Sequence, residues 1–266
     1  MGIGDDIITL SEIQQLYQQD QLPRCPQQQG RTIHKGRDLS KSVIYEQQCE
    51  IAVSGVSYEI RPNGLRRYQQ DHLYQLRPAR IQLTPAEQQW AQQQATGLGQ
   101  RWLIINPDAK YPSIHAHNKH WPHWQSLVQE MNNLGYVCVR LRSPKYHNSF
   151  AHTVEIETDS FRKVLAMIQQ APSVITTDGA VHHAAAAFDR PCVVIWGHCT
   201  HPAAQPNLHR AGLGYRGQIN IVSGGGPCYT QHRECEQCHE AMNVITASYV
   251  RTVWQKSLAH PVTDNE

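Results

Sequence analysis

Hydrophobic and polar positions follow a regular order along the second half of the chain. Strand-like apolar runs occur at 102–106, 136–141 and 219–222, and helix-like patterns occur at 121–133, 160–170 and 247–258. Strands that alternate with helices of roughly 10–15 residues are typical of a doubly wound parallel sheet. The pattern therefore predicts an α/β fold for this half of the chain.

The segment 173–197 carries the clearest signal within that pattern. A β-branched strand is followed by a polar loop with Asp178 and Gly179, an alanine-rich helix that contains His182 and His183, and a second apolar strand. This order is typical of one β-α-β unit of a parallel sheet. Ligands bind beyond the carboxyl ends of such strands, and helix N-termini attract anions. The sequence therefore predicts a phosphate site at Asp178 and His182.

The first half of the chain contains glutamine clusters with apolar residues between them. The apolar positions between residues 7 and 16 fit one face of a helix that starts near Asp5 or Asp6. The glutamines then form its solvated face. Residues 25–82 give only weak strand signals, at 42–45 and 51–53, and we cannot order them into a sheet.

A stronger helix signal lies at the end of this half. Thr84-Pro85-Ala86-Glu87 is a capping box with proline at the first helical position, which predicts a helix from Pro85 to about Ala95. Glycines at 97 and 99 end it. We expect a domain boundary near residues 96–101, which divides the chain into domains of residues 1–98 and 99–266.

Composition narrows the class of protein. The 266 residues carry a formal net charge of +2 and no clustered basic face, which argues against a nucleic-acid partner. No apolar run reaches the roughly 20 residues that span a bilayer, and the N-terminus lacks the pattern of a signal peptide. Cys138 and Cys192 lie in apolar strand-like runs, where free cysteine acts as a small hydrophobe. We therefore expect a soluble, cytoplasmic protein in a reducing compartment.

A cysteine cluster follows the last strand-like runs. Cys235 and Cys238 form a Cys-x2-Cys pair, and Cys228 lies seven residues before Cys235. This spacing is typical of a small knuckle in which thiolates bind zinc or iron. Cys199 is the candidate fourth ligand, with His232 and His239 as further choices. Packed free thiols and a local disulfide remain alternatives.

The order of these motifs resembles glycosyltransferase family 9, the bacterial heptosyltransferases and their phage or prophage-encoded relatives. The resemblance rests on Lys119-x-Trp121-Pro122, on Asp178-Gly179-x-x-His182 with three alanines after it, and on Pro191 before an apolar strand that ends in glycine. When the motifs are aligned on Gly179 and His182, the family's aspartate falls on Thr177, and Asp178 replaces its serine. The double histidine and the cysteine cluster resemble the phage-type branch.

A second resemblance lies at the N-terminus. Gly2-Ile3-Gly4-Asp5 resembles the Gly-x-Gly-Asp loop of these transferases, whose aspartate is the proposed general base. The resemblance assigns that role to Asp5. In the family a strand precedes this loop, whereas in this chain only Met1 does, so we expect a shortened N-terminal domain.

The resemblance implies a GT-B fold with two Rossmann-like domains, the N-terminal one on the acceptor side and the C-terminal one on the donor side. It implies that a sugar is transferred, with inversion, from a nucleotide-diphosphate donor to a hydroxyl group of the acceptor. ADP-heptose is the candidate donor, and the acceptor is a glycan, a lipid-linked molecule or a protein. Lys119, His182 and the helix N-terminus would stabilise the leaving diphosphate, so no catalytic metal is required. The candidate donor-binding residues are Lys110, Lys119, Asp178, Gly179, His182 and His183. Some relatives hold an iron through cysteines.

Other interpretations of these residues stay open. Lys119 can be a solvated lysine, Asp178 a helix N-cap, and His182 a packed helical histidine. At the level of function, the alternatives are a non-catalytic nucleotide-sugar or carbohydrate binding protein and a sugar-nucleotide epimerase of similar fold.

Overall fold

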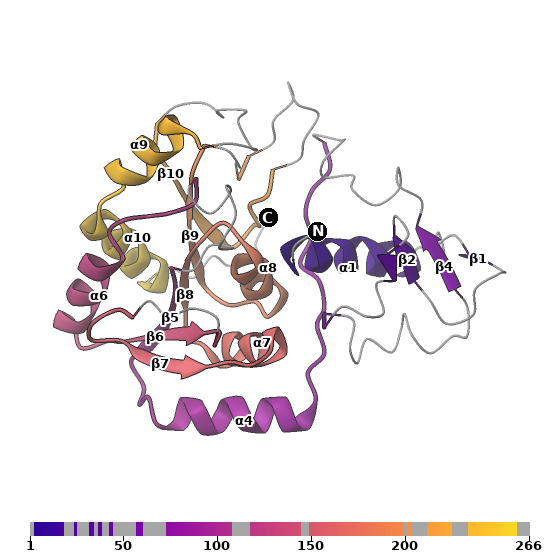
Figure 1. Cartoon of the computed structure of the whole chain (residues 1–266), viewed down its shortest axis with the longest axis horizontal. Coiled ribbons are helices and arrows are strands. Elements are labelled where there is room, and N and C mark those ends of the chain that lie inside the picture. The colour runs from indigo at the N-terminus through magenta and orange to yellow at the C-terminus, as the bar shows by residue number, and fades with distance from the viewer. Residues whose placement is uncertain are drawn as a thin grey trace.

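The computed structural model describes most of the C-terminal half and parts of the N-terminal half. The described residues are 3–18, 24–25, 32–34, 37–38, 43–44, 57–60, 73–107, 118–144, 149–198, 202–203, 212–224 and 234–259. A six-stranded sheet flanked by helices occupies the larger part of the molecule (Figure 1).

The six strands run in the order β10-β9-β8-β5-β6-β7, and each neighbouring pair is parallel. The strands are β5 (Trp102–Asn106), β6 (Val137–Arg142), β7 (Val154–Glu157), β8 (Val174–Thr177), β9 (Cys192–Trp196) and β10 (Gln218–Val222). From β5 the chain proceeds outward to β6 and β7, and then returns to β8 on the other side of β5. The order therefore reverses between β5 and β8, where ligands bind in sheets of this type. The predicted α/β fold is confirmed.

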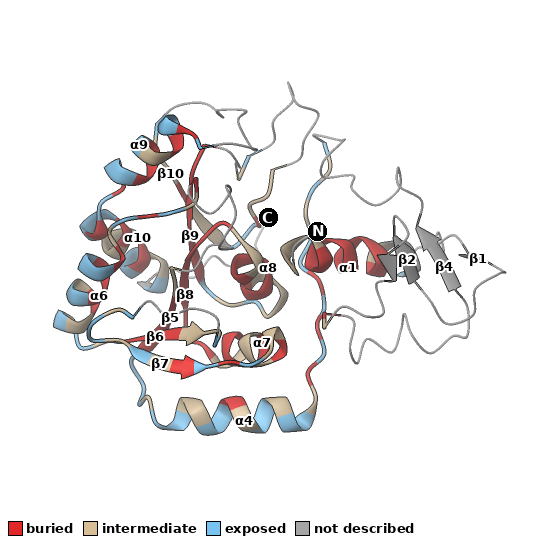
Figure 2. Cartoon of the chain, in the orientation of Figure 1, coloured by how far each residue is buried: buried red, intermediate tan, exposed pale blue. Residues whose placement is uncertain are grey.

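Helices cover both faces of this sheet (Figure 1). One face carries α7 (Phe161–Gln170) and α8 (Ala180–Ala187), and the other carries α6 (Trp124–Asn133), α9 (Glu236–Val244) and α10 (Ala247–Ala259). Alternate residues of each strand enter opposite cores, because side chains on a strand alternate between its two faces. In β5, Ile104 packs in the first core and Leu103 in the second. Figure 2 shows the strands largely buried and the outer surfaces of the helices exposed.

Among the residues that the structure describes, the N-terminal part contributes two helices and a small sheet. The helices are α1 (Ile3–Gln18) and α4 (Pro85–Thr96), and the strands are β1 (Arg24–Cys25), β2 (Thr32–His34), β3 (Arg37–Asp38) and β4 (Ser57–Ile60). These short strands pair in the order β1-β4-β2-β3. Val43 and Ile44, within a segment with a weak strand signal, lie in a turn. Residues 51–53 lie outside the described residues.

Helix α1 is buried on nearly all sides. The prediction of a solvated glutamine face is wrong for Gln14, which is 8% exposed. Its side-chain amide donates to the carbonyl oxygen of Arg80 at 2.8 Å and accepts from the Arg80 N–H at 2.8 Å. Ser11 donates to the carbonyl oxygen of Arg77 at 2.7 Å. Polar side chains of α1 thus satisfy the backbone of the segment 77–80, which explains their burial.

An ion pair joins α4 to α7. The capping box of α4 forms as the sequence predicts, with Glu87 accepting from the Thr84 N–H. Arg162 of α7 donates to both carboxylate oxygens of Glu87, at 2.7 and 2.6 Å, and to the Gln82 carbonyl oxygen at 2.9 Å. The bond from Arg162 lowers the pKa of Glu87, so this contact stabilises the fold above the ordinary pKa of a glutamate and is lost in acid.

Replacing Arg162 by lysine is expected to lower the free energy of unfolding by about 1–3 kcal/mol, because one ammonium group cannot replace the fork-like contacts of the guanidinium. Denaturant unfolding measures the change. Arg251→Lys is the matched control, since Arg251 forms a partly exposed ion pair with Glu130 at 3.4 Å. Its expected cost is below about 0.5 kcal/mol. Equal losses in the two variants would contradict this assignment.

Candidate active site

The candidate site lies at the carboxyl end of β8, where the strand order of the sheet reverses. Asp178 follows the strand directly, and Gly179 caps the N-terminus of α8 in an extended conformation. The Lys119 ammonium group lies 2.5 Å from a carboxylate oxygen of Asp178. The Asp178 side chain is 3% exposed and the Lys119 side chain 23% exposed. The structure thus brings together the lysine and the aspartate that the sequence predicts for a phosphate site.

Lys119 is held in place through its neighbour Asn118. The Asn118 side chain accepts a hydrogen bond from the backbone N–H of Cys235 at 2.9 Å. The Asn118 carbonyl oxygen lies so close to Gly197 that a Cβ atom at Gly197 would approach it to 2.5 Å. Trp121, two residues beyond Lys119, donates to the Ile245 carbonyl oxygen at 2.7 Å. The loop before α6 is therefore fixed between the end of β9 and helix α9.

His182 lies in the first turn of α8 and is fully buried. Its Nδ1 accepts a hydrogen bond from the Gly179 N–H at 3.0 Å, so the ring proton resides on Nε2, which donates to the Leu213 carbonyl oxygen at 3.3 Å. Burial lowers the pKa of His182 to about 4, against the opposing effect of the Asp178 charge. His182 is therefore a neutral imidazole at physiological pH, with both ring nitrogens engaged.

His183 is the second buried histidine of α8. Its Nδ1 lies 2.9 Å from the hydroxyl of Tyr215, and burial lowers its pKa well below the ordinary value. The rings of His182 and His183 have centroids 3.8 Å apart. The Gln218 side chain donates to the His182 carbonyl oxygen at 2.6 Å. The sequence did not predict these partners of the histidines, which are Leu213, Tyr215 and Gln218. They lie more than 30 residues along the chain, and no motif marks them.

Asp5 lies in the first turn of α1. The helix begins at Ile3, so the predicted loop at residues 2–5 is wrong for the residues from Ile3 onward, and Gly2 lies outside the described residues. A Cβ atom at Gly4 would meet the His183 ring at 3.0 Å and the Ala180 Cα at 3.5 Å. The glycine therefore permits the close approach of the first turns of α1 and α8, and Asp5 is the next residue of α1.

The carboxylate and the two imidazoles form one cluster. Single ligand atoms of Asp178, His182 and His183 lie within 4.8 Å of one another, a separation that a metal ion could bridge. However, Lys119 neutralises Asp178, and His182 Nδ1 accepts the Gly179 N–H. The Asp178 carboxylate and His182 Nδ1, which would have to bind a metal, are thus already engaged with protein groups. The N-terminus of α8 adds positive potential. The arrangement therefore favours an anion.

The cysteine cluster is described in part. Cys235 caps the N-terminus of α9, Cys238 lies in its first turn, and the two free thiols are buried together. His239 follows, and its Nε2 is buried without a hydrogen-bond partner among the described residues. The other two predicted ligands, Cys228 and Cys199, lie outside the described residues, as does the candidate phosphate contact Lys110.

The buried histidines predict a pH-dependent stability. Since the pKa of His182 falls to about 4 in the folded chain, the unfolded chain binds protons first as the pH decreases from about 6.5. The free energy of unfolding is therefore expected to fall between pH 6.5 and 4, by roughly 2–3 kcal/mol for His182 alone, since one pKa unit corresponds to about 1.4 kcal/mol. Melting temperatures across this range measure the effect. His182→Gln should reduce the dependence but not remove it, because His183 is also buried with a lowered pKa, whereas His152→Asn, at an exposed site, should leave it unchanged.

The described helices include none that is both long and apolar enough to cross a membrane.

Comparison with known proteins identifies the family. The family model described as glycosyltransferase family 9 (heptosyltransferase) matches residues 67–237. Lipopolysaccharide heptosyltransferase 2 of Salmonella typhimurium is 29% identical over 121 residues, which are 40% of this chain and 33% of that protein. Its Escherichia coli K12 counterpart is 25% identical over 177 residues, which are 60% of this chain and 48% of that protein. The chain thus spans a third to a half of the length of these relatives.

Two solved structures also resemble the chain. The ADP-heptose lipopolysaccharide heptosyltransferase II of E. coli matches with a TM-score of 0.49 and 19% identity, over 70% of this chain and 54% of that one. The iron-containing dodecameric glycosyltransferase TibC of enterotoxigenic E. coli matches with a TM-score of 0.46 and 14% identity, over 70% and 52%. The family model covers well over half of the sequence, including the six strands of the parallel sheet, Lys119 and the start of α8. The chain therefore belongs to glycosyltransferase family 9, the heptosyltransferase family.

Proposed function

We propose that this chain transfers a sugar from a nucleotide-diphosphate donor to an acceptor hydroxyl, with inversion at the anomeric carbon, and that ADP-heptose is the donor. The main support is the position of Lys119 beside Asp178 at the N-terminus of α8, where the strand order of the sheet reverses. A lysine and a helix N-terminus together form an anion site. Family membership supports the same assignment.

The leaving group determines what the donor site has to do. As the acceptor oxygen bonds to the anomeric carbon, the bond from that carbon to the diphosphate oxygen breaks, and its electron pair leaves with the diphosphate. Lys119 and the N-terminus of α8 stabilise the growing negative charge. Lys110 and Gly179 are assigned as further contacts of the phosphates.

Asp178 changes partner when the donor binds. In the unliganded chain its carboxylate neutralises Lys119. A diphosphate competes for the same ammonium group, which frees Asp178 to accept hydrogen bonds from sugar hydroxyls and to orient the anomeric carbon. This role follows from the short distance between the two groups, and it does not require the family's usual aspartate position.

His182 and His183 act as neutral groups in this proposal. His182 holds the Gly179 backbone through Nδ1, and His183 is held by Tyr215. Their contribution is to fix the first turn of α8, so that its N–H groups meet the diphosphate without reorganisation. The two histidines therefore support the diphosphate site without carrying a positive charge of their own.

Asp5 is proposed as the general base that takes the proton from the acceptor hydroxyl. The approach of Gly4 to His183 and Ala180 supports this, because it brings the first turn of α1 to the N-terminus of α8. Such proton transfer contributes typically ~10²–10⁴-fold to the rate. We assign the acceptor side to residues 1–98 and the donor side to residues 99–266, in a GT-B arrangement. The buried free thiols of Cys138 and Cys192 support a reducing, cytoplasmic location.

Calorimetric titration with ADP and with ADP sugars tests the donor site, and a transfer assay with lipopolysaccharide-core acceptors tests the activity. ADP should bind the wild-type chain. Asp5→Asn should retain ADP binding and lose transfer by about 100-fold or more. Asp159→Asn is the control for the loss of one carboxylate, because the Asp159 side chain is 67% exposed and lies outside α1. Absence of ADP binding would overturn the proposal. Donor binding without sugar transfer would indicate a non-catalytic binding protein. Isomerisation of the donor in the absence of an acceptor would indicate an epimerase.

We also propose a structural zinc or iron at Cys235 and Cys238, with Cys228 and Cys199 as the remaining ligands. The buried thiol pair supports a site that accepts a thiophilic metal, as does the adjacent His239, whose buried Nε2 has no hydrogen-bond partner in the described part of the chain. When bound, the metal would fix the N-terminus of α9. Elemental analysis of the purified protein should find about one metal ion per chain. Cys238→Ser should abolish metal binding and lower the melting temperature. A metal-free wild type of unchanged stability would refute the site.

A further inference from the structure

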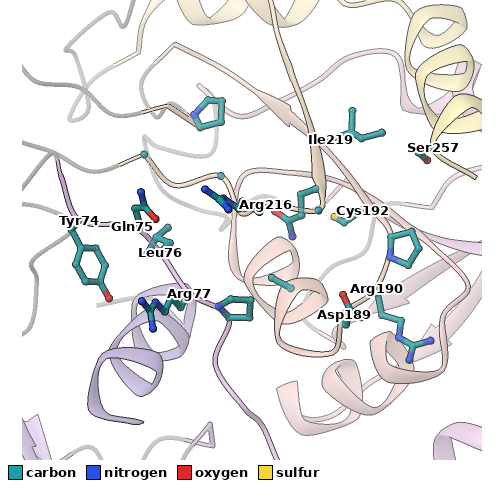
Figure 3. A pocket seen from close by; sticks show the side chains of 18 of the residues that line it. Tyr74, Gln75, Leu76, Arg77, Asp189, Arg190, Cys192, Arg216, Ile219 and Ser257 are labelled. Carbon is teal, nitrogen blue, oxygen red and sulfur yellow. The ribbon is translucent and has the colours of Figure 1, made fainter. Parts of the chain in front are cut away.

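A cavity of about 990 Å³ lies at the amino ends of β9 and β10, the end opposite to Asp178 and Lys119 (Figure 3). Its walls come mainly from three segments, 73–78, the end of α8 with the residues up to Cys192, and the segment from Gly212 to Ile219, and Pro202 and Ser257 complete the lining. Ligand pockets typically measure about 300–1,000 Å³, so the volume suits a small molecule.

Guanidinium groups dominate the charge of this cavity. Arg77, Arg190 and Arg216 line it, against one carboxylate from Asp189. Figure 3 shows Arg216 extending toward Gln75 and Arg77, whereas Arg190 points away from them. Within the described part of the chain, neither Arg77 nor Arg216 forms an ion pair. Both side chains are exposed, and an anion in the cavity can pair with guanidinium groups that have no carboxylate partner among the described residues.

Uncharged polar groups line the cavity beside the arginines. Gln218 donates through Nε2 to the His182 carbonyl oxygen, but its Oε1 is buried and makes no hydrogen bond with any described residue. Because this Oε1 atom is not accessible from the cavity, Gln218 supports the cavity wall and does not contact a ligand. The side chains of Gln75 and Ser257 add further hydrogen-bonding groups. Burial raises the pKa of the Cys192 thiol, so this residue contributes no thiolate nucleophile.

We propose that this cavity binds a phosphorylated sugar, with the phosphate between Arg77 and Arg216 and a sugar hydroxyl hydrogen-bonded to the Gln75 side chain. Arginine forks match phosphate oxygens in charge and in geometry. The same wall, residues 212–218, also holds the buried histidines through Leu213, Tyr215 and Gln218. The inference is independent of the proposed donor site, because it concerns the opposite end of the sheet.

Calorimetric titration with glucose 6-phosphate tests the site, with glucose as the uncharged comparison. Glucose 6-phosphate should bind the wild-type chain, and glucose should not. Arg216→Gln and Arg77→Gln should each weaken the binding by about ten-fold or more, since each removes charge-assisted hydrogen bonds. Arg251→Gln is the matched control for the loss of one positive charge, and it should bind like the wild type.

Titrations of the same ligand in saturating ADP and with Lys119→Ala distinguish this cavity from the donor site. Binding should persist in both, because neither ADP nor Lys119 occupies the cavity. Displacement by ADP, loss in Lys119→Ala, or unchanged binding in both cavity variants would overturn the proposal, as would the absence of binding to the wild type. Arg77 and Arg216 are exposed, and melting curves should show that their variants fold.

Discussion

An alanine in place of Lys119 is expected to weaken ADP binding and sugar transfer by about 100-fold or more. Removing one preorganised positive group from a site of developing negative charge costs typically ~10²–10³-fold. The N-terminus of α8 remains, but a helix dipole contributes much less than a full charge at contact distance. Calorimetry with ADP measures the binding, and the transfer assay measures the rate.

The same variant also changes stability, which has to be separated from binding. Without Lys119 the carboxylate of Asp178, 3% exposed, is left buried without its cation. Breaking a buried pair by removing one partner costs about 3–5 kcal/mol, and the partial exposure of Lys119 reduces this to about 1–3 kcal/mol. Asp178→Asn in the same chain removes the stranded charge. The double variant should therefore recover stability, while ADP binding stays weak.

Two further variants complete this cycle. Asp178→Asn alone should keep or strengthen ADP binding, because the carboxylate no longer competes with the diphosphate for Lys119. Lys163→Ala is the charge-matched control, since Lys163 forms a local ion pair with Asp159 on α7 at 2.9 Å. It should leave ADP affinity unchanged. Wild-type ADP affinity in the Lys119→Ala, Asp178→Asn double variant would show that Lys119 does not bind the diphosphate.

Local signals explain why most elements of the six-stranded sheet, and α4 before it, could be predicted. Helix α7 begins directly after Ser160, which caps it, and α4 begins at Pro85 within a capping box. Strand β5 spans the residues that its apolar run indicates. Each of these signals lies within a few residues of the element that it determines, so a single sequence contains the needed information.

Two elements of the larger sheet domain, β7 and α9, were missed for different reasons. Strand β7 alternates Val154 and Ile156 with glutamates, and it forms at the sheet edge through ion pairs from β6. Arg140 contacts Glu155 at 3.0 Å, and Arg142 contacts Glu157 at 3.0 Å. Helix α9 begins within the cysteine motif, whose spacing indicated a metal knuckle and concealed the helix.

The candidate site divides along the same line. Asp178, Gly179, His182 and His183 follow one strand, and the motif with Lys119 could be matched to a family, so the sequence indicated all five. The partners that determine protonation could not be found from local signals. Leu213 and Tyr215 lie 31 and 32 residues beyond the histidines that they contact, and only the packing of their segment beside α8 brings them there.

Gly197 offers a test of how Lys119 is positioned. This glycine follows β9, and a Cβ atom there would lie 2.5 Å from the Asn118 carbonyl oxygen and 3.5 Å from the Met242 methyl group. The backbone at Gly197 is not in the left-handed region, so alanine meets no conformational penalty of its own. The cost of Gly197→Ala is therefore steric, and it falls on the backbone next to Lys119.

Gly197→Ala is expected to lower the free energy of unfolding by about 2–3 kcal/mol, as an overpacked core does. The loop that carries Lys119 has to shift away from β9, and because Asn118 also binds the Cys235 N–H, that hydrogen bond is strained as well. A displacement of ~1 Å can reduce a rate by ~10²-fold, so ADP affinity and transfer should fall although every charged group remains.

The matched control is Gly224→Ala, because no atom lies within 4 Å of a Cβ at Gly224. This variant should keep the wild-type stability and ADP affinity. Denaturant unfolding and calorimetry, carried out on both variants, separate the two effects of Gly197→Ala. If stability falls at Gly197 while ADP affinity stays at the wild-type level, the close contact supports the fold alone. A combined loss shows that the contact between Gly197 and Asn118 positions Lys119 for the diphosphate.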